Sequence, residues 1–439
     1  MKICTLVVFI LYNITVKAQI ITTFAGSSSC GNSGDGGPAT SAKIYDPAGG
    51  IFDKSWNYYF CTFSNTVRKV TPSGIIYTIA GTGMAGFSGD GGPATMAKLS
   101  QPISVALDAD GNFYISDEAN NRIRKIDTSG IITTFAGNGV PAFAGDGGMA
   151  TAASLLAPSW VLVDDTGNIY DVESCRIRKV DKSGIIHTIV GNGVPGFSGD
   201  GGPASAAEIQ PFSAFLDKDN NLFIADDENS RVRRVDAGTD IITIIAGTGT
   251  PGFSGDGGQA TAAEVIPGYL AVDVYGNLFI ANGSSKIRKV DPSGIITTFA
   301  GTGIMGYSGD NGSATDAQIY NPEGIAFDSC GNVYIADDAN CRIRKITFPK
   351  CNYLGVENEN NANLNLSIYP NPTYDQLNIN NLKTPSTYHL LSIVGAAVQQ
   401  GALKEGDNSI SIKAIPSGMY MLEIIDEQKN RTVNKVIKE

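Results

Sequence analysis

The amino-acid sequence predicts an all-β protein, with a six-bladed β-propeller followed by a small, immunoglobulin-like C-terminal β-sandwich. The glycine-rich decapeptide GFSGDGGPAT, which begins at Gly86, occurs six times in close copies that lie 55, 56, 54, 56 and 54 residues apart. Each period also contains four short apolar segments separated by turn residues. Beyond residue 365 the repeat ends and the pattern of apolar residues changes. A regular period of this kind is typical of propellers and other repeat architectures.

Residues 1–19 have the features of a cleaved secretory signal peptide. Lys2 precedes an apolar run, and Val16, Lys17 and Ala18 form a stretch that suits signal peptidase. No later segment approaches the roughly 20 apolar residues of a membrane-spanning helix. We therefore expect an exported protein without a transmembrane segment.

Residues 20–26 indicate how the propeller closes. The last period contains three strands but lacks the fourth, whereas the chain begins at Ile20 with one copy of that strand, IITTFAG. We expect this segment to complete blade six, so that the two ends of the propeller, residues 20–351, are joined. Such a seam leaves no free sheet edge.

The four apolar segments of each period predict the strands of one blade. They contain four to seven residues, are rich in Ile, Val, Tyr and Phe, and are bounded by Gly, Asp, Asn or Pro. The DADGN stretch at Asp108 and its relatives suit tight hairpins, because Gly and Asn accept positive φ.

These strands resemble the NHL repeat. An apolar strand ending in Asp, a GNxYIAD strand and an NRI strand recur from about Ile20 to Phe348. Proteins of the NHL family are six-bladed β-propellers, so the resemblance implies that fold. The period here is longer than the family's unit, and the extra residues lie in the GDGG insertion.

The aspartates of the GDGG insertions have two interpretations. They are Asp35, Asp90, Asp146, Asp200, Asp256 and Asp310. A calcium site gathers several oxygen-bearing side chains, whereas each copy offers one carboxylate among glycines. The sequence favours a turn into a short helical segment that the Asp caps, with Pro in the first turn. No cofactor is expected, and a structural or axial calcium ion is an alternative without support in the sequence.

Two charge patterns also recur in the blades. In four blades an acid and an arginine lie five residues apart, as Asp117 and Arg122 do, which predicts an ion pair within the blade. Arginine-lysine doublets run from Arg68-Lys69 to Arg344-Lys345. Such a doublet in every blade is usually a solvated or paired strand face, and the alternative is an anion-binding ring.

The inner strand departs from the repeat where a ligand could bind. The second residue after its initial Pro is small in four blades but is Trp160 in blade three and Tyr269 in blade five. With Phe212 of blade four, three aromatic side chains are expected near the mouth of the axial channel, and Glu323 is the one acid near these strand starts. These four residues are the predicted ligand site. The alternative is that the aromatics plug the channel.

The sequence favours a binding module over an enzyme. The formal net charge of -11 argues against nucleic-acid binding. Some six-bladed propellers, including calcium-dependent lactonases and an NHL-like amidating lyase, hold an axial metal, but the axial histidines that the lyase needs are missing and no catalytic motif is found. The leading hypothesis is a secreted or cell-surface module for an extracellular protein, peptide or glycan. The alternative is a metal-dependent lyase or hydrolase with its site in the channel.

Six cysteines follow the signal peptide, and in an exported chain they predict disulfides. The propeller model brings Cys30 and Cys341 together at the seam on the GDGG face, and Cys330 and Cys351 together on the opposite face. Cys61 is a rival partner for Cys30. Cys175, alone in blade three, is expected to be free.

Residues 352–365 form an Asn-rich linker, and residues 366–439 differ in character. The motifs YPNP at Tyr369, QLNI at Gln376 and SGMYMLEI at Ser417 resemble the C-terminal sorting domain of the type IX (Por) secretion system of Bacteroidetes. This resemblance implies export through the type IX machinery to the medium or the outer cell surface. From its alternating strands alone the segment is a small β-sandwich, and a carbohydrate-binding sandwich is the alternative.

Overall fold

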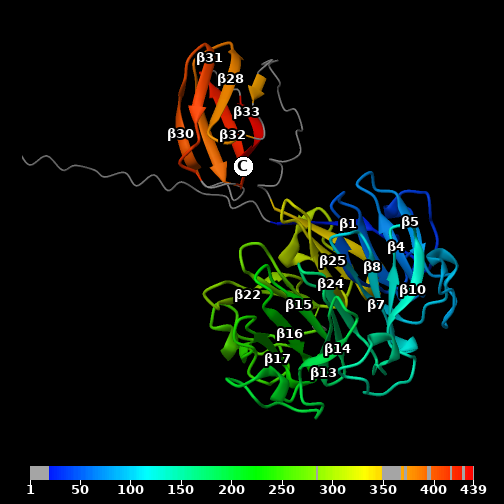
Figure 1. Cartoon of the computed structure of the whole chain (residues 1–439). Coiled ribbons are helices and arrows are strands. Elements are labelled where there is room, and N and C mark those ends of the chain that lie inside the picture. Colours follow the sequence, from blue (N-terminus) through cyan, green and yellow to red (C-terminus); the bar gives the residue numbers. More distant parts are fainter. Residues whose placement is uncertain are drawn as a thin grey trace, which may run out of the picture. The chain divides into compact units, whose positions relative to one another are not determined.

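The computed structural model describes residues 19–282, 285–348, 367–369, 373–392, 397–415, 418–427 and 431–438. The chain divides into two compact units, Met1–Pro349 and Lys350–Glu439, and both are built of strands (Figure 1). The predicted signal peptide, apart from Gln19, and the predicted linker lie outside the described residues. In the described part of the chain, no helix has the length and apolar character needed to cross a membrane.

Six antiparallel sheets form the first unit, and each has four main strands. The first strands of the sheets contact one another in a closed ring, from β2 through β7, β11, β15, β19 and β24 back to β2. The sheets are therefore the blades of a propeller, which confirms the predicted all-β fold.

The strands of the six blades have the following bounds. The first, innermost strands are β2 (Pro47–Phe52), β7 (Pro102–Leu107), β11 (Trp160–Val163), β15 (Ser213–Leu216), β19 (Tyr269–Val272) and β24 (Pro322–Phe327). The second are β3 (Tyr58–Thr62), β8 (Phe113–Asp117), β12 (Ile169–Glu173), β16 (Leu222–Asp226), β20 (Leu278–Asn282) and β25 (Val333–Asp337). The third are β4 (Thr66–Val70), β9 (Arg122–Ile126), β13 (Arg176–Val180), β17 (Arg231–Val235), β21 (Lys286–Val290) and β26 (Arg342–Thr347). The fourth are β5 (Ile76–Ala80), β10 (Ile131–Ala136), β14 (Ile186–Val190), β18 (Ile242–Ala246), β22 (Ile296–Ala300) and β1 (Ile20–Ala25).

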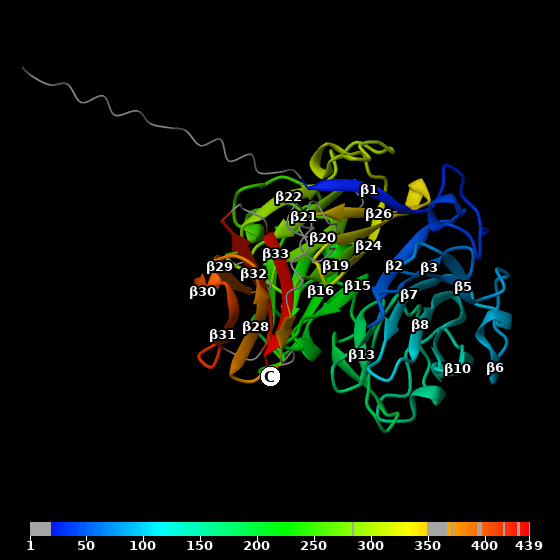
Figure 2. The same cartoon turned by 90° about the horizontal axis from the view of Figure 1, so that it is seen from above.

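The fourth strand of blade six comes from the start of the described chain. β1 pairs antiparallel with β26, with Ile21 opposite Ile346, and the two strands lie side by side (Figure 2). β1 therefore supplies the strand that the last period lacks, and it covers the edge that β26 would otherwise expose.

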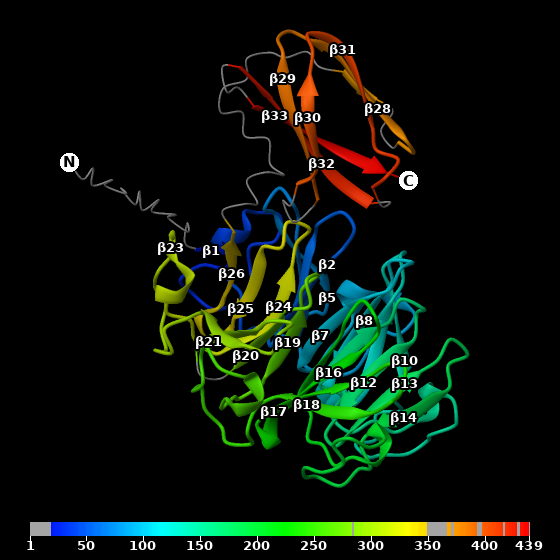
Figure 3. The same cartoon turned by 90° about the vertical axis from the view of Figure 1, so that its left-hand side faces the viewer.

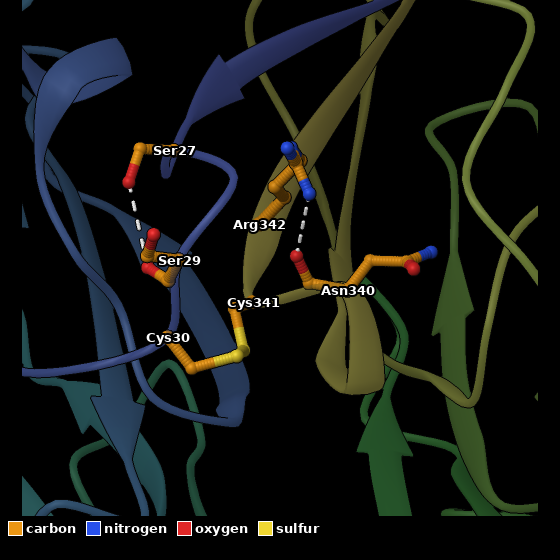
Figure 4. Close-up of a disulfide and its surroundings, with 6 residues drawn as sticks. All are labelled: Ser27, Ser29, Cys30, Asn340, Cys341 and Arg342. Carbon is orange, nitrogen blue, oxygen red and sulfur yellow. Dashed lines mark hydrogen bonds between the residues drawn. A yellow bond between two sulfur atoms is a disulfide. The ribbon is translucent and has the colours of Figure 1, made fainter.

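A disulfide between Cys30 and Cys341 staples this seam. Their Cα atoms are 5.3 Å apart, and Figure 4 shows Cys30 in the loop after β1 and Cys341 next to Arg342, where β26 begins. The predicted bridge across the seam is confirmed, and neither Cys61 nor Cys175 is bonded to another cysteine of the described residues. The predicted bridge from Cys330 to Cys351 is not tested, because Cys351 lies outside the described residues.

The GDGG insertions cover the outer edges of the blades. Each insertion follows the fourth strand of one blade and bonds to the fourth strand of the next: the Gly36 amide donates to the Ile76 carbonyl at 2.8 Å, and Gly91 to Ile132 at 2.8 Å. An uncovered outer strand would expose a row of unpaired backbone groups, so every blade needs such a cover. The insertions contain two-residue strands β6 (Gly92–Pro93) and β23 (Gly312–Ser313) and the 3₁₀ helices η1 (Ala39–Ser41), η2 (Ala94–Met96), η4 (Ala150–Ala152), η5 (Ala204–Ala206), η7 (Ala260–Ala262) and η8 (Ala314–Asp316).

The hydrophobic core of the propeller lies between neighbouring blades. Between blades one and two, Tyr59 of β3 and Ile115 of β8 pack with Ala94, Ala97 and Leu99 of the insertion. The insertions are therefore lids that fill the space between blades as well as covers for strand edges. Three further 3₁₀ helices lie in the turns between second and third strands: η3 (Glu118–Asn120), η6 (Asp227–Asn229) and η9 (Asp338–Asn340).

The second unit contains two sheets around one core. Leu377 and Ile379 pack with Leu390, Leu422 and other apolar residues of both sheets, and Figure 3 shows the strands of this unit. One sheet has β27 (Ser367–Tyr369), β28 (Gln376–Leu382) and β31 (Gly406–Ser411), and the other has β30 (Ala397–Leu403), β29 (Ser386–Ser392), β32 (Gly418–Asp426) and β33 (Arg431–Lys438).

Candidate ligand-binding site at the axial mouth

Each GDGG aspartate forms an ion pair with an arginine of the third strand. This arginine is followed by Lys in five blades and by Arg234 in blade four, and its side chain is fully buried in all six blades. A buried guanidinium requires such a partner, because an unpaired buried charge is costly. The pairs and their N–O distances are Asp35–Arg68 2.7 Å, Asp90–Arg124 2.5 Å, Asp146–Arg178 2.7 Å, Asp200–Arg233 3.0 Å, Asp256–Arg288 2.7 Å and Asp310–Arg344 2.7 Å.

In blades one, two, three, five and six the second oxygen of this carboxylate accepts a hydrogen bond from the fourth strand. The Thr134 amide and hydroxyl donate to Asp90 Oδ2 at 3.2 and 2.7 Å. The prediction that the Asp caps the following helix is wrong: the N-cap positions of η1 and η2 are Pro38 and Pro93, and no side chain bonds there. The aspartate instead ties the insertion to the third and fourth strands.

The predicted pairing of Asp117 with Arg122 is also wrong. Arg122 donates to the backbone carbonyls of Asn120 at 2.9 Å and Asn138 at 3.0 Å, whereas Asp117 contacts the buried Arg124 at 3.3 Å. The anion-binding interpretation of the doublets fails for their arginines, because these are buried and paired.

The structure brings the three predicted aromatic residues together on the axis. The ring of Tyr269 lies 5.3 Å from that of Trp160 and 5.1 Å from that of Phe212, in edge-to-face geometry. Trp160 belongs to blade three but reaches blade one, where a Cβ atom on Gly49 would lie 2.9 Å from the indole. Tyr269 is buried, and the other two rings are half-buried.

Small side chains elsewhere in the ring let the inner strands approach one another. The Ser159 hydroxyl donates to the Phe212 carbonyl and the Ser213 hydroxyl to the Gly268 carbonyl, both at 2.8 Å. Between blades six and one, a Cβ atom on Gly324 would lie 2.6 Å from the Cα of Gly49. Small residues at the start of the inner strands therefore let neighbouring blades contact one another, and the large residues Trp160 and Tyr269 fill the centre of the ring.

Glu323 lies beside this aromatic group and is linked to a second carboxyl. The side-chain amide of Asn321 donates to Asp338 Oδ2 at 2.8 Å and reaches Glu323 Oε1 at 3.5 Å. Both carboxyl groups are at least nine-tenths buried. Their other oxygens, Glu323 Oε2 and Asp338 Oδ1, are buried, and apart from the Tyr269 hydroxyl beside Glu323 no donor among the described residues reaches them. Buried polar atoms are normally satisfied, so these two indicate a place where a donor fits.

The electrostatics of the mouth are strongly acidic. Burial raises the pKa of Glu323 to about 8, the Asp338 and Asp46 carboxylates add to the rise, and the nearby Tyr269 hydroxyl partly offsets it. Burial, with Asp46 and Asp337, raises the pKa of Asp338 to about 6. Burial also raises the pKa of Glu118. Each shift reflects the cost of holding negative charge here, which a cation would relieve.

The sequence interpretation missed most of these acids. Asp46 directly precedes the Pro that begins an inner strand, and Glu118 and Asp338 directly follow the last Asp of a second strand. Because Asp46, Glu118 and Asp338 each lie next to the end of a strand, the strand boundaries could have shown that they lie at the same end of the propeller axis. Among the residues that the structure describes, no three His, Cys, Asp or Glu side chains are grouped to hold a metal ion. Carboxyls beside aromatic rings suit an organic cation.

Two family models match the chain. Residues 82–143 and 138–195 match the teneurin NHL domain, and residues 367–439 match the secretion system C-terminal sorting domain.

Curated relatives align with about two thirds to three quarters of this chain. Teneurin-1 of Homo sapiens is 29% identical over 381 residues, which cover 76% of this chain but 13% of teneurin-1. The protein SUPPRESSOR OF QUENCHING 1, chloroplastic, of Arabidopsis thaliana is 30% identical over 295 residues, which cover 63% of this chain and 27% of that protein.

Solved structures share the fold at low sequence identity. A Bacteroides thetaiotaomicron protein of unknown function has a TM-score of 0.56 at 20% identity, and an auxiliary nutrient binding protein of the same organism has 0.55 at 18%. Each match covers 75% of this chain and 76% of the other. The six-sheet ring, the NHL match and the match of the tail agree with one another. This chain is an NHL-repeat β-propeller protein with a C-terminal sorting domain of the type IX secretion system.

Proposed function

We propose that this protein is an exported binding module whose ligand places a cationic group at the axial mouth. The observation that carries the proposal is the buried carboxyl pair at the mouth, because Glu323 Oε2 and Asp338 Oδ1 have no donor among the described residues other than the Tyr269 hydroxyl beside Glu323. An ammonium or guanidinium group supplies the donors that these atoms lack and the positive charge that the acidic mouth favours.

The aromatic group supports the same class of ligand. Trp160 and Phe212 are half-buried beside Tyr269, and a cation near aromatic faces gains further stabilisation. The propeller core already holds these rings in place, so little side-chain entropy is lost on binding.

The insertion loops suggest that the ligand is part of a larger partner. In blades two to six their tips expose large apolar side chains, as Met84 does at 58%, Phe253 at 49% and Ile304 at 62%. Repeated exposed apolar groups around a polar centre are typical of protein-binding surfaces. We therefore favour an extracellular peptide or protein with exposed basic residues over a glycan.

Export is the part of the function that the C-terminal unit supports. Residues 367–439 match a secretion sorting domain, which indicates delivery to the outer surface or the medium. We propose that the type IX machinery is the partner of this unit, and that the mature propeller meets its ligand outside the cell.

The test uses the mature full-length chain on a mixed array of basic, acidic and neutral peptides and glycans. We expect basic peptides to bind, and the Glu323→Gln/Asp338→Asn double variant to bind them at least about tenfold more weakly, because a charge-assisted bond contributes about 1.5–3 kcal/mol. Asp110→Asn is the matched control, because Asp110 is an exposed acid in a hairpin. Equal binding by the double variant, or capture of glycans alone, would overturn the proposal. A stoichiometric, tightly bound metal ion would favour the metal-dependent lyase or hydrolase instead.

A further inference from the structure

Blade one departs from the other five at one place, and we infer that this place is a socket for an arginine side chain of a binding partner. The socket is separate from the axial mouth, so this inference does not depend on the ligand proposed there. It rests on a comparison of the same position in all blades.

In four other blades the third strand begins with an arginine that fills this position. They are Arg122, Arg176, Arg231 and Arg342, and each guanidinium lies 3.6–3.8 Å from the centre of an aromatic ring of the insertion loop. In blade four, Arg231 donates to the backbone carbonyls of Asn229 and Thr248, both at 2.9 Å. Arg122 makes the corresponding two bonds in blade two.

Blade one lacks both members of this stack. The strand register places Thr66 where the arginine stands in blade two, and Asn32 stands in the insertion where Phe87 stands in blade two. Thr66 is short and bonds to the Thr62 hydroxyl at 2.8 Å. A cavity of about 270 Å³ results, and Asn32, Asp35, Thr66, Thr78 and Thr82 are among the residues that line it.

The glycines beside this position show that the space is open in blade one and filled in blades two, three and four. A Cβ atom on Gly139 or Gly193 would collide with the guanidinium of Arg122 or Arg176. At the equivalent Gly83, the nearest atoms are Asn32 Nδ2 at 3.5 Å and the Ser64 carbonyl at 3.7 Å. The carbonyls of Ser64 and Thr82 correspond to the two that receive the guanidinium in blades two and four.

The charge at the socket favours a cation. Asp35 is 48% exposed, more than the other five GDGG aspartates, which range from 26% to 43%. Asp35 pairs with Arg68 at 2.7 Å, and nearly half of its side chain remains accessible to a second cation. The site therefore has an accessible carboxylate, two carbonyls and room for a side chain.

The geometry selects arginine over lysine. The Ser64 and Thr82 carbonyls correspond to the two guanidinium acceptors of blades two and four. Two such acceptors match the planar, forked donors of a guanidinium, whereas an ammonium is a compact point charge. Asn32 and the threonine hydroxyls offer further polar contacts to the peptide groups that flank the arginine.

The test is an NMR titration of the mature full-length chain with N-acetyl-arginine-methylamide, and with the lysine analogue as comparison. We expect saturable binding of the arginine probe at about 1 mM, which is typical of a fragment of this size. The shifts should concentrate at Asn32, Asp35, Thr66 and Thr82. The lysine analogue should bind several-fold more weakly.

Thr66→Arg supplies the side chain from within the chain, as in blade two, and should weaken binding of the probe at least tenfold without lowering the melting temperature. Thr128→Arg adds the same charge on an exposed turn and should leave binding unchanged. If Thr66→Arg fails to fold, the double variant Phe87→Asn/Arg122→Thr decides the question, because it should open a second socket and double the stoichiometry.

Absence of saturable binding by the native chain, equal binding by Thr66→Arg, or shifts centred on Glu323 and Asp338 would each overturn the inference. The Glu323→Gln/Asp338→Asn variant should keep the socket. Failure of the axial proposal and failure of this inference are therefore distinguishable.

Discussion

The contribution of each GDGG aspartate to stability depends on how many carboxylates contact the buried arginine with which it pairs. Arg288 in blade five is fully buried and forms an ion pair with one described carboxylate, Asp256, at 2.7 Å. Arg124 in blade two is equally buried but contacts two carboxylates, Asp90 and Asp117. Removal of one partner should therefore be more costly in blade five than in blade two.

We expect Asp256→Ala to lower the free energy of unfolding by about 3–5 kcal/mol, the usual cost of leaving a buried charge without its partner. Asp90→Ala is the matched control and should cost clearly less, because Asp117 remains. Thermal and urea unfolding of the two variants measure the difference. Equal losses would mean that the GDGG carboxylates do not neutralise the buried arginines.

Glu323 gives the propeller a pH-dependent stability. Its pKa is about 8 in the folded protein, against an ordinary value of 4.5. At a pH between 4.5 and 8, the Glu323 carboxyl is protonated in the folded state but ionised in the unfolded chain. The stability that this group contributes is therefore fully present below about pH 4.5 and is lost as the pH rises towards 8. Glu323→Gln removes this loss.

The melting temperature of Glu323→Gln relative to the native chain should therefore rise between pH 5.5 and pH 9. About 2 °C is expected for each kcal/mol in a domain of this size. Asp110→Asn serves as the control. A difference that does not change with pH would show that Glu323 ionises normally in the fold.

At the scale of single residues, the sequence predicted the aromatic group and Glu323 but not the other acids around them. Trp160 and Tyr269 stand out because they replace small residues at a repeated position. Asp46 and Asp338 do not stand out in the sequence, because they come close together only when the inner strands close into a ring. The pairing of Asp117 with Arg124 rather than Arg122 depends on burial, which residue spacing does not reveal.

The elements that decide the fold are the seam strand and the insertions. β1 pairs along β26, and the insertions pair with the outer edge of each blade. The orphan strand could be predicted by counting strands, since only one period was incomplete. The packing of the insertions as lids against neighbouring blades could also be predicted from their repetition, but their pairing with strand edges could not, because their Gly-rich sequence contains no strand pattern.

Deletion of residues 20–26 should expose the edge of β26 and cause aggregation or a large fall in melting temperature. The variant keeps Cys30, so a bridge to Cys341 remains available and only the strand is lost. Size-exclusion chromatography and thermal unfolding measure the effect. A monomer that melts with the parent would place the closure of the ring elsewhere.

The whole molecule combines two units with separate cores. The propeller core contains no residue of the C-terminal unit in any described cluster. We therefore expect the propeller to fold without the tail, and the motifs that identified the tail in the sequence to act in export rather than in stability.

Removal of residues 366–439 should leave a folded propeller that accumulates in the periplasm of a host with a type IX system. Immunoblots of periplasm, outer surface and medium, with the complete chain as control, measure the distribution. Undiminished export of the shortened chain would contradict the role of the sorting domain.

The most direct test of the proposed cation site is the proton released on binding. Glu323, with a pKa of about 8, is mainly protonated at pH 7 and must ionise to pair with a cation. Calorimetric titration with a basic peptide in buffers of different ionisation enthalpy should therefore show release of nearly one proton, about 0.9 per site at most. Glu323→Gln should release none. A binding heat that is independent of the buffer, or the same release from Glu323→Gln, would contradict a cationic ligand at the axial mouth.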